Sequence, residues 1–280
     1  MGKLVLIDGH SILNRAFYGV PELTNSKGLH TNAVYGFLNI MFRVIEDEGA
    51  DYLAVAFDLK EPTFRHKMYA AYKGTRKPMP QELHEQVPVM KEVLTAMGVP
   101  ILTKAGYEAD DILGTIAKRC AAEGVEVSIV SGDRDLLQLA DTHIKIRMPR
   151  TSKGTTEIRD YYPEDVKAEY QVTPIEFIDV KALMGDPSDN IPGVKGVGEK
   201  RAKLFNSLGI FDVDSLIHFY PRKYEDWTVG KTLNDVNDGD TICIKATLIT
   251  PVKEAAIRRG LTLYKCKFSD GENVIAVTIF

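Results

Sequence analysis

The fold class can be inferred from one segment, Glu126-Val-Ser-Ile-Val-Ser-Gly-Asp133-Arg-Asp135-Leu-Leu-Gln-Leu139. It begins as an apolar run of strand length, breaks at Ser131-Gly132 and continues in a leucine-rich helical pattern. A buried strand that ends in a small-residue turn and leads into a helix is the repeating unit of a parallel α/β sheet. In such sheets the chemistry lies beyond the carboxyl ends of the strands, and this stretch places two carboxylates there, Asp133 and Asp135.

Other apolar runs end in the same way. Predicted strands over Lys3–Asp8 and Asp51–Asp58 each finish on an aspartate. We therefore expect a mostly parallel sheet flanked by helices. Short strands are also predicted over Gly98–Thr103 and Ile144–Arg147, and helices from Thr31 or Asn32, over Gln81–Met97, from Glu108, and over Pro163–Tyr170 and Pro174–Met184.

The composition is that of an ordinary soluble protein. The chain has 280 residues, of which 44% are hydrophobic and 26% charged, with a net charge of −4. No apolar run approaches the length of a membrane span and the N-terminus lacks a signal-peptide layout, so we expect a cytoplasmic protein. Cys120, Cys243 and Cys266 match no metal-ligand spacing and are interpreted as incidental thiols.

Nine carboxylates fall at strand ends, in the adjoining helix turns or in a later loop. One such acid alone is ordinarily a helix cap or a solvated loop residue, but many converging like charges destabilise a site unless cations neutralise them. Hard oxygen ligands favour Mg²⁺ or Mn²⁺, and a pair of such ions is the usual apparatus for attack on a phosphodiester. The predicted metal ligands are Asp8, Asp58, Glu108, Asp110, Asp111, Asp133, Asp135, Asp186 and Asp189.

A basic segment, Phe64–Pro78, follows the second predicted strand. Its lysines and arginines alternate with Tyr69 and Tyr72, a mixture that suits phosphate contacts and base stacking. A solvated helix face is the alternative on composition alone. Lys73, if it lies near the metal ions, would stabilise charge that develops on a phosphate.

Gly193-Val-Lys-Gly-Val-Gly-Glu-Lys200 resembles a helix-hairpin-helix. Its glycines allow backbone N–H groups to approach a phosphate at a helix N-terminus. Glycine-rich turns are common. The interpretation as a helix-hairpin-helix is supported by the position of this turn directly after the acidic loop.

Taken together and in order, these stretches resemble the 5′-nuclease domain of bacterial DNA polymerase I, within the flap endonuclease superfamily. The resemblance covers about residues 1–203 and also includes Thr31-Asn-Ala-Val-Tyr-Gly-Phe37, Tyr72-Lys-Gly-Thr-Arg76 and Gly185-Asp-Pro-Ser-Asp-Asn-Ile-Pro-Gly193. It implies a PIN/flap-endonuclease-like fold with a helical arch over about 64–97 and a helix-hairpin-helix over about 190–208. It also implies that all nine acids belong to the family's metal cluster.

The resemblance implies an activity, cofactors and partners. The activity is Mg²⁺-dependent, structure-selective hydrolysis of DNA phosphodiesters near 5′ ends and flaps, in replication and repair. Two Mg²⁺ ions, replaceable by Mn²⁺, would be joined by K⁺ at the helix-hairpin-helix, and Lys73 and Arg76 would be catalytic. The protein would be a bacterial, nucleoid-associated monomer that binds 5′ flaps and nicked or branched duplex and serves a DNA polymerase acting separately. The implied DNA-binding residues are Arg15, Arg65, Tyr72, Lys73, Arg76, Gly193, Lys195, Gly196, Gly198 and Lys200.

The segment 204–280 departs from that pattern. Alternating runs over Thr241–Thr250, Leu261–Phe268 and Asn273–Phe280 predict antiparallel β structure. With their helical lead-in, they resemble the start and the wedge module of RecG-type branch-migration helicases, a partial OB-fold that binds branched DNA. We therefore hypothesise a fusion whose seam lies within Gly193–Lys203 and which lacks the usual last helices of the nuclease.

Two functions from different classes fit this sequence. One is an active 5′ nuclease, and the other is a catalytically weak protein that binds branched DNA. A phosphatase of the α/β type is set aside, because it requires an Asp-x-Asp motif after the first strand and Asp8-Gly-His10 does not supply one.

Overall fold

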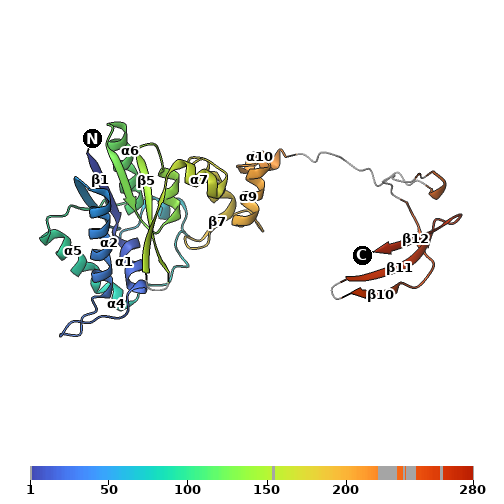
Figure 1. The fold of residues 1–280 in the computed structure, drawn as a ribbon, viewed down its shortest axis with the longest axis horizontal. Helices are drawn as coiled ribbons and strands as arrows, with labels where there is room; N and C mark the ends of the chain where they lie inside the picture. The colour runs from blue at the N-terminus through green and yellow to red at the C-terminus, as the bar shows by residue number, and fades with distance from the viewer. Residues whose placement is uncertain are drawn as a thin grey trace. The chain divides into compact units, whose positions relative to one another are not determined.

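The computed structural model describes residues 2–152, 155–219, 232–235, 237, 244–258 and 261–279. The chain divides into two compact units, Met1–Phe219 and Tyr220–Phe280, which are described separately below (Figure 1). Among the described helices, none has both the length and the apolar character that crossing a bilayer requires.

The first unit is built on a six-stranded, mostly parallel sheet, as predicted. The strand order is β3-β2-β1-β4-β5-β6. Neighbouring strands from β3 to β5 are parallel, and only β6 runs antiparallel to its neighbour. The strands are β1 (Lys3–Asp8), β2 (Tyr52–Ala56), β3 (Ile101–Leu102), β4 (Glu126–Val130), β5 (Ile144–Ser152) and β6 (Thr155–Tyr161).

Helices cover both faces of this sheet because alternate strand residues point to opposite sides. Val5 and Ile7 of β1 join one hydrophobic cluster, and Leu6 joins the other. The first face carries α1 (Gly9–Gly19), α2 (Asn32–Glu48) and α5 (Gln86–Ala96), and the second carries α6 (Ala109–Ala122), α7 (Pro163–Tyr170) and α8 (Phe177–Met184). Figure 1 shows α2 and α5 together on one side of the sheet.

One predicted helix is divided in two. The apolar spacing over Gln81–Met97 predicts a single helix, whereas the structure has α4 (Gln81–His84) and α5, separated at Glu85. Pro88 has no N–H to donate to the carbonyl of residue 84, so an uninterrupted helix would lose that hydrogen bond. The buried Gln86 side chain beside the break accepts hydrogen bonds from the N–H groups of residues 33 and 34, at 2.8 and 3.2 Å, and so ties α5 to the start of α2.

Four other segments also differ from the prediction. The strands expected over Asp51–Asp58 and Gly98–Thr103 shorten to five and two residues, which leaves Asp58 in the loop after β2. The leucine-rich pattern after Asp133 forms a 3-10 helix, η1 (Arg134–Leu139), with Asp133 as its N-cap. The segment expected to form an arch contains α3 (Phe64–Met68), a run of turns, and then α4 and α5.

The first unit continues past the sheet into short elements. A two-stranded ribbon, β7 (Gly185–Asp186) and β8 (Ile191–Pro192), encloses the acidic loop, and α9 (Glu199–Ser207) and α10 (Val213–Ile217) follow. Gly185, at φ +70°, and Gly193 approach each other so closely that a Cβ on Gly185 would lie 2.2 Å from the nitrogen of Gly193. Only glycine fits at this crossing.

The second unit is a small antiparallel sheet, as predicted for the tail. Strand β11 pairs with β10 and β12 and, at its end, with β9. The bounds are η2 (Leu233–Asp235), β9 (Thr247–Leu248), β10 (Lys253–Arg258), β11 (Leu261–Ser269) and β12 (Val274–Ile279). Thr241, Cys243 and Phe280 of the predicted runs lie outside the described residues.

Candidate metal-binding active site

Asp8, the last residue of β1, is the N-cap of α1 and one of the most enclosed acids in the chain. Its Oδ1 accepts a hydrogen bond from the Ser11 N–H at 3.1 Å, and its Oδ2 accepts one from the Ser131 hydroxyl at 2.8 Å. Because Ser131 follows β4, this second bond joins the carboxyl ends of neighbouring strands. Burial raises the pKa of Asp8 to about 6, although both hydrogen bonds lower it.

Asp58 lies beside Asp8 in the loop after β2. Its Oδ1 accepts a hydrogen bond of 2.7 Å from the N–H of Ala109, which fixes the loop against the start of α6. His10 is its other neighbour, with Nδ1 lying 3.5 Å from Oδ2. Burial opposes ionisation of Asp58, but these contacts hold its pKa below the ordinary value.

The loop after β4 carries Asp133 and Asp135. The Asp133 carboxylate accepts a hydrogen bond from the N–H of Asp135 at 2.9 Å, while the N–H of Asp133 donates to the Ser131 hydroxyl at 3.0 Å. Gly132 stands where a Cβ would come within 3.0 Å of Nη2 of Arg15. The turn is therefore packed tightly against α1.

Asp110 and Asp111, both in the first turn of α6, have different surroundings. Asp110 is directed at the other acids: burial raises its pKa well above the ordinary value, and the charges of neighbouring carboxylates, Asp8 foremost, raise it further. Asp111 instead forms a two-pronged ion pair with Arg65, at 2.7 and 2.8 Å. Its pKa is lowered, because that pair outweighs the cost of burial.

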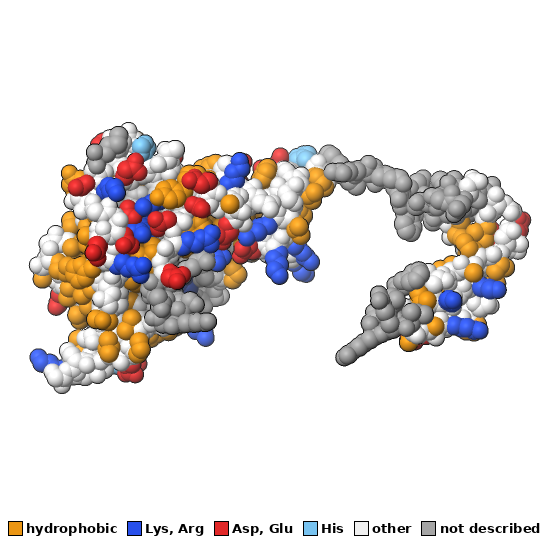
Figure 2. Space-filling model, viewed as in Figure 1, with side chains coloured by type: hydrophobic (Ala, Val, Ile, Leu, Met, Phe, Trp, Pro, Cys, Tyr) orange, Lys and Arg blue, Asp and Glu red, His pale blue; other side chains and the backbone are white. Residues whose placement is uncertain are grey.

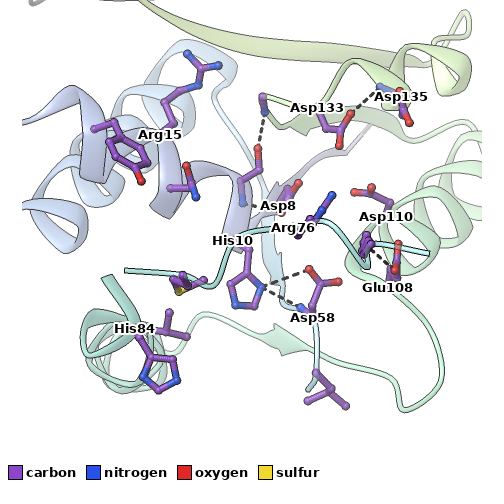
Figure 3. A pocket seen from close by; sticks show the side chains of 18 of the residues that line it. Asp8, His10, Arg15, Asp58, Arg76, His84, Glu108, Asp110, Asp133 and Asp135 are labelled. Carbon is purple, nitrogen blue, oxygen red and sulfur yellow. Dashed lines mark hydrogen bonds and ion pairs between the residues drawn. The ribbon is translucent and has the colours of Figure 1, made fainter. Parts of the chain in front are cut away.

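These side chains surround one cavity of about 1300 Å³ (Figure 3). Seven of the nine predicted ligands line it, and Asp111 and Asp189 do not. Lys73, Arg76 and Arg15 line it as well, whereas Arg65 and Tyr72 do not. The seven acids that line it are Asp8, Asp58, Glu108, Asp110, Asp133, Asp135 and Asp186.

Basic side chains are tied to several of these acids. As the side chains are placed, no three acidic, histidine or cysteine groups among the described residues form a set that holds a metal ion. The ion pairs join Glu108 to Lys73 (2.8 Å), Asp111 to Arg65 (2.7 Å), Asp189 to Arg76, and both Asp135 (2.8 Å) and Asp186 (3.1 Å) to Lys181.

Four acids take no part in the ion pairs just described: Asp8, Asp58, Asp110 and Asp133. Two of them, Asp8 and Asp110, have raised pKa values because burial and like charges disfavour ionisation. A hard cation would relieve that repulsion, and carboxylate oxygens are its preferred ligands. The donor set at the carboxyl ends of the strands therefore fits a divalent cation.

The basic segment crosses the acidic loop at the edge of the cavity. The Tyr72 hydroxyl lies 3.0 Å from Oε2 of Glu108 and 2.9 Å from Oδ2 of Asp189. Lys73 donates its N–H to the carbonyl of Asp189 at 2.9 Å, and the Asn190 side chain donates to the carbonyl of Ala71 at 2.8 Å. Lys73 and Asn190 both have positive φ, +56° and +58°, which is uncommon for residues other than glycine.

The cavity residues that the sequence does not predict include His10 and Lys181. His10 follows Asp8 by two residues, in a turn that was interpreted only as a helix start. Lys181 lies in α8, in the otherwise mostly apolar stretch Phe177–Met184. A lysine in such a stretch, five residues before Asp186, is a signal that points to a buried acidic partner.

The predicted helix-hairpin-helix forms a turn that leads into α9. Gly196 has φ +83°, and Gly198 is the N-cap of α9. Lys195 and Lys200 are exposed beside it. Figure 2 shows basic side chains around this part of the first unit and an intermixture of acids and bases over the rest of the visible face.

A parallel sheet with acids at the carboxyl ends of its strands, followed by a helical module, is the layout of metal-dependent 5′ nucleases. The chain belongs to the 5′-3′ exonuclease family: the model of its N-terminal resolvase-like domain matches residues 3–171, and that of its C-terminal SAM fold matches residues 172–266. The second match runs through the seam expected within Gly193–Lys203. The resemblance of the tail to the RecG wedge stays a prediction.

Curated relatives include two bacterial DNA polymerases I. That of Bacillus subtilis (strain 168) is 50% identical over 278 residues, which are 98% of this chain and 31% of the relative. That of Bacillus caldotenax is 50% identical over 208 residues, which are 74% of this chain and 24% of the relative. The chain thus spans less than a third of the length of either relative.

Solved structures agree on the fold. The bacteriophage T5 5′-exonuclease with bound divalent zinc ions has a TM-score of 0.61 at 25% identity, covering 79% of this chain and 81% of that one. The bacteriophage T5 flap endonuclease in a pseudo-enzyme–product complex with DNA and metal ions has a TM-score of 0.62 at 25% identity, covering 80% and 81%.

Proposed function

We propose that this chain is a Mg²⁺-dependent, structure-selective nuclease that hydrolyses DNA phosphodiesters near 5′ ends and flap junctions. The observation that carries the proposal is the cavity at the carboxyl ends of the strands. There, acids from five separate parts of the chain meet the basic residues Lys73 and Arg76. A binding module for branched DNA has no need of buried carboxylates that repel one another.

The acids divide into two groups that suit two ions. Asp8, Asp58, Asp110 and Asp133, with Glu108 beside them, would hold one Mg²⁺, with Mn²⁺ as a substitute. Asp135 and Asp186 would hold a second ion, joined by Asp189, which belongs to the same loop as Asp186 but lies outside the cavity lining. Two such ions supply Lewis-acid stabilisation of the reacting oxygens and activate water near neutral pH. Asp111 is better explained as a partner that positions Arg65, because the two form a two-pronged pair and neither of them lines the cavity.

The basic residues would orient the phosphate. Lys73 and Arg76 are held at the cavity by Glu108 and Asp189, and a phosphate that arrives with the cations would take over those contacts. Tyr72 anchors the segment between them. Arg15, in the wall next to Gly132, would contact the same strand.

The remaining predictions concern substrate and context. The segment 64–97 would enclose a single strand, and the turn at Gly193, Lys195, Gly196, Gly198 and Lys200 would bind downstream duplex, with K⁺ at its backbone. We place the nuclease region at 1–203 and a partial OB-fold module at 204–280. The chain would act as a cytoplasmic, nucleoid-associated monomer beside a DNA polymerase.

The test is cleavage of a 5′-labelled flap duplex by the purified chain, with Mg²⁺ and with EDTA, against a blunt duplex of the same sequence. The proposal predicts cutting near the junction that requires the divalent ion and prefers the flap. Binding of branched DNA without cutting at any Mg²⁺ or Mn²⁺ concentration would contradict it and favour a junction-binding protein.

A further inference from the structure

The imidazole of His10 lines the cavity and has no role in the reaction proposed above. It lies in the first turn of α1, two residues after Asp8. Its Nδ1 accepts a hydrogen bond from the Asp58 N–H at 3.2 Å and lies 3.5 Å from Oδ2 of the same residue. The Nδ1 edge of the ring therefore contacts Asp58, as the dashed lines in Figure 3 show.

The other ring nitrogen, Nε2, carries a hydrogen in either protonation state. In the neutral ring Nδ1 is an acceptor, which places the single proton on Nε2, and in the charged ring both nitrogens are protonated. Nε2 is thus a donor in both of these states, as long as the neutral ring accepts the Asp58 N–H at Nδ1. Within the part of the chain that the structure describes, no group accepts a hydrogen bond from it.

The ring is held in place by Phe57, which is fully buried. The His10 ring meets the Phe57 ring edge to face, with centroids 5.3 Å apart and planes at 84°. A Cβ on Gly9 would lie 2.5 Å from Phe57, so the start of α1 sits directly on this ring. The ammonium of Lys91, another cavity residue, lies 4.8 Å from the centroid of the same ring.

A phosphate that enters the cavity needs hydrogen-bond donors, because the seven carboxylates of the cavity wall can only accept. An ionised carboxylate only accepts hydrogen bonds, and so does a phosphate oxygen. Lys73 and Arg76 already donate to Glu108 and Asp189 at one part of the wall. In the view of Figure 3, Asp58 lies between His10 and Glu108, the partner of Lys73.

We propose that His10 is a substrate-positioning residue, whose Nε2–H donates to a phosphate oxygen of the bound strand other than the one that Lys73 and Arg76 contact. Lys91 adds positive charge at the same wall. The inference rests on the proposed function, since it assumes that a nucleic-acid strand enters this cavity. It concerns binding and orientation of the strand, not proton transfer.

The experiment measures binding of 5′-flap DNA in EDTA, so that hydrolysis does not interfere. A neutral methylphosphonate replaces one phosphate at a time on either side of the junction. His10→Asn keeps an acceptor for the Asp58 N–H but loses the distant donor, whereas His10→Gln keeps an N–H near the position of Nε2. His143→Asn is the matched control, because His143 pairs with Glu126 at the opposite end of the strands.

We expect wild-type affinity to fall about tenfold when one particular phosphate is neutralised, the loss typical of a charge-assisted hydrogen bond. H10N should bind unmodified DNA about tenfold more weakly than wild type. A methylphosphonate at that same phosphate should cause no further loss of affinity in H10N. H10Q should recover most of the affinity and the sensitivity, and H143N should match wild type. Equal affinity of H10N and wild type would overturn the proposal, and so would a loss that is the same at every position.

The outcome is separable from that of the nuclease proposal. We call it coupling when a methylphosphonate at one phosphate weakens binding by wild type but not by H10N. Mg²⁺-dependent cutting by wild type, with no coupling at any phosphate, would refute the His10 contact alone. Coupling at one phosphate without cutting would support the contact and refute the nuclease activity. Thermal melting of H10N and H10Q, expected to match wild type within 2–3 °C or so, checks that both variants fold.

Discussion

The ammonium nitrogen of Lys181 lies 2.8 Å from Oδ1 of Asp135. The same nitrogen lies 3.1 Å from Oδ2 of Asp186, so one lysine joins the loop after β4 to the later acidic loop. Both acids are proposed ligands of the second ion. Lys181 thus occupies a place where a positive charge is needed, and a divalent cation would have to share those oxygens with it.

Lys181→Met should therefore separate stability from metal affinity. In EDTA, the loss of the only ion-pair partner described here for Asp135 and Asp186 should cost about 1–2 kcal/mol, discounted for partial exposure. That corresponds to a melting temperature lower by about 3–6 °C. Divalent ions should bind more tightly to this variant, as titration calorimetry would show. Lys118→Met, at an exposed site in α6, is the control. Unchanged melting and unchanged affinity together would show that Lys181 is incidental.

Lys73→Ala should slow the chemical step far more than it weakens binding. Lys73 is held 2.8 Å from Glu108 by a strained backbone, a position suited to a phosphate in its transition state. We expect a loss of about 10²–10³ in the single-turnover rate, as for removal of one preorganised donor. DNA affinity should change only a few-fold. Lys67→Ala, at an exposed position of α3, should behave as wild type. A loss confined to affinity would make Lys73 an electrostatic contact only.

The metal-free protein should lose stability as the pH rises from about 4 to about 6. The pKa of Asp8 is raised by burial from 3.8 when unfolded to about 6 when folded, so the folded state binds more protons across this window. The free energy of unfolding should fall by about 3 kcal/mol on this account. Urea titrations of wild type and of Asp8→Asn in EDTA measure it, because the variant lacks the titrating group.

A divalent ion should weaken this pH dependence. Bound at Asp8, it would favour the ionised carboxylate and flatten the profile between pH 4 and 6. A D8N profile as steep as that of wild type would assign the pH dependence to other groups. A wild-type profile that Mg²⁺ leaves unchanged would argue against an ion at Asp8.

Tyr72→Phe should loosen the crossing between the basic segment and the acidic loop. The buried hydroxyl bridges Glu108 and Asp189, and its removal should cost about 1–2 kcal/mol in the free energy of unfolding. Tyr69→Phe is the control, because Tyr69 is 42% exposed. Equal stability of the two variants would mean that the bridge contributes nothing to the fold.

The sequence predicts those parts of the fold and site that follow from local patterns. The apolar runs before Asp8 and Asp133 identify buried parallel strands, and the carboxyl ends of such strands meet at one edge of the sheet. That is why acids more than a hundred residues apart could be placed together in advance. The helix from Glu108 and the helix Pro163–Tyr170 likewise carry clear start signals.

What the sequence could not predict depends on contacts between distant segments. Asp111 and Asp110 are neighbours, yet Asp111 pairs with Arg65 whereas Asp110 lines the cavity, and this depends on where the fold places Arg65 of α3. Lys181 pairs with acids in two separate loops, and His10 is held by the backbone N–H of Asp58. Neither contact follows from the local sequence. Pro88 is a sequence signal for the break at Glu85, but the apolar spacing continues across that break and so predicts one uninterrupted helix.

Asp133→Ala tests whether the acids of this cavity hold the ions that cleave DNA. The measurement is the single-turnover cleavage rate of a 5′-labelled flap with Mg²⁺, beside the dissociation constant for the same DNA. The control is Asp214→Ala, whose side chain is 87% exposed. We predict that D133A loses cleavage while it keeps or gains DNA affinity, and that D214A behaves as wild type. Cleavage by D133A at the wild-type rate would contradict the account.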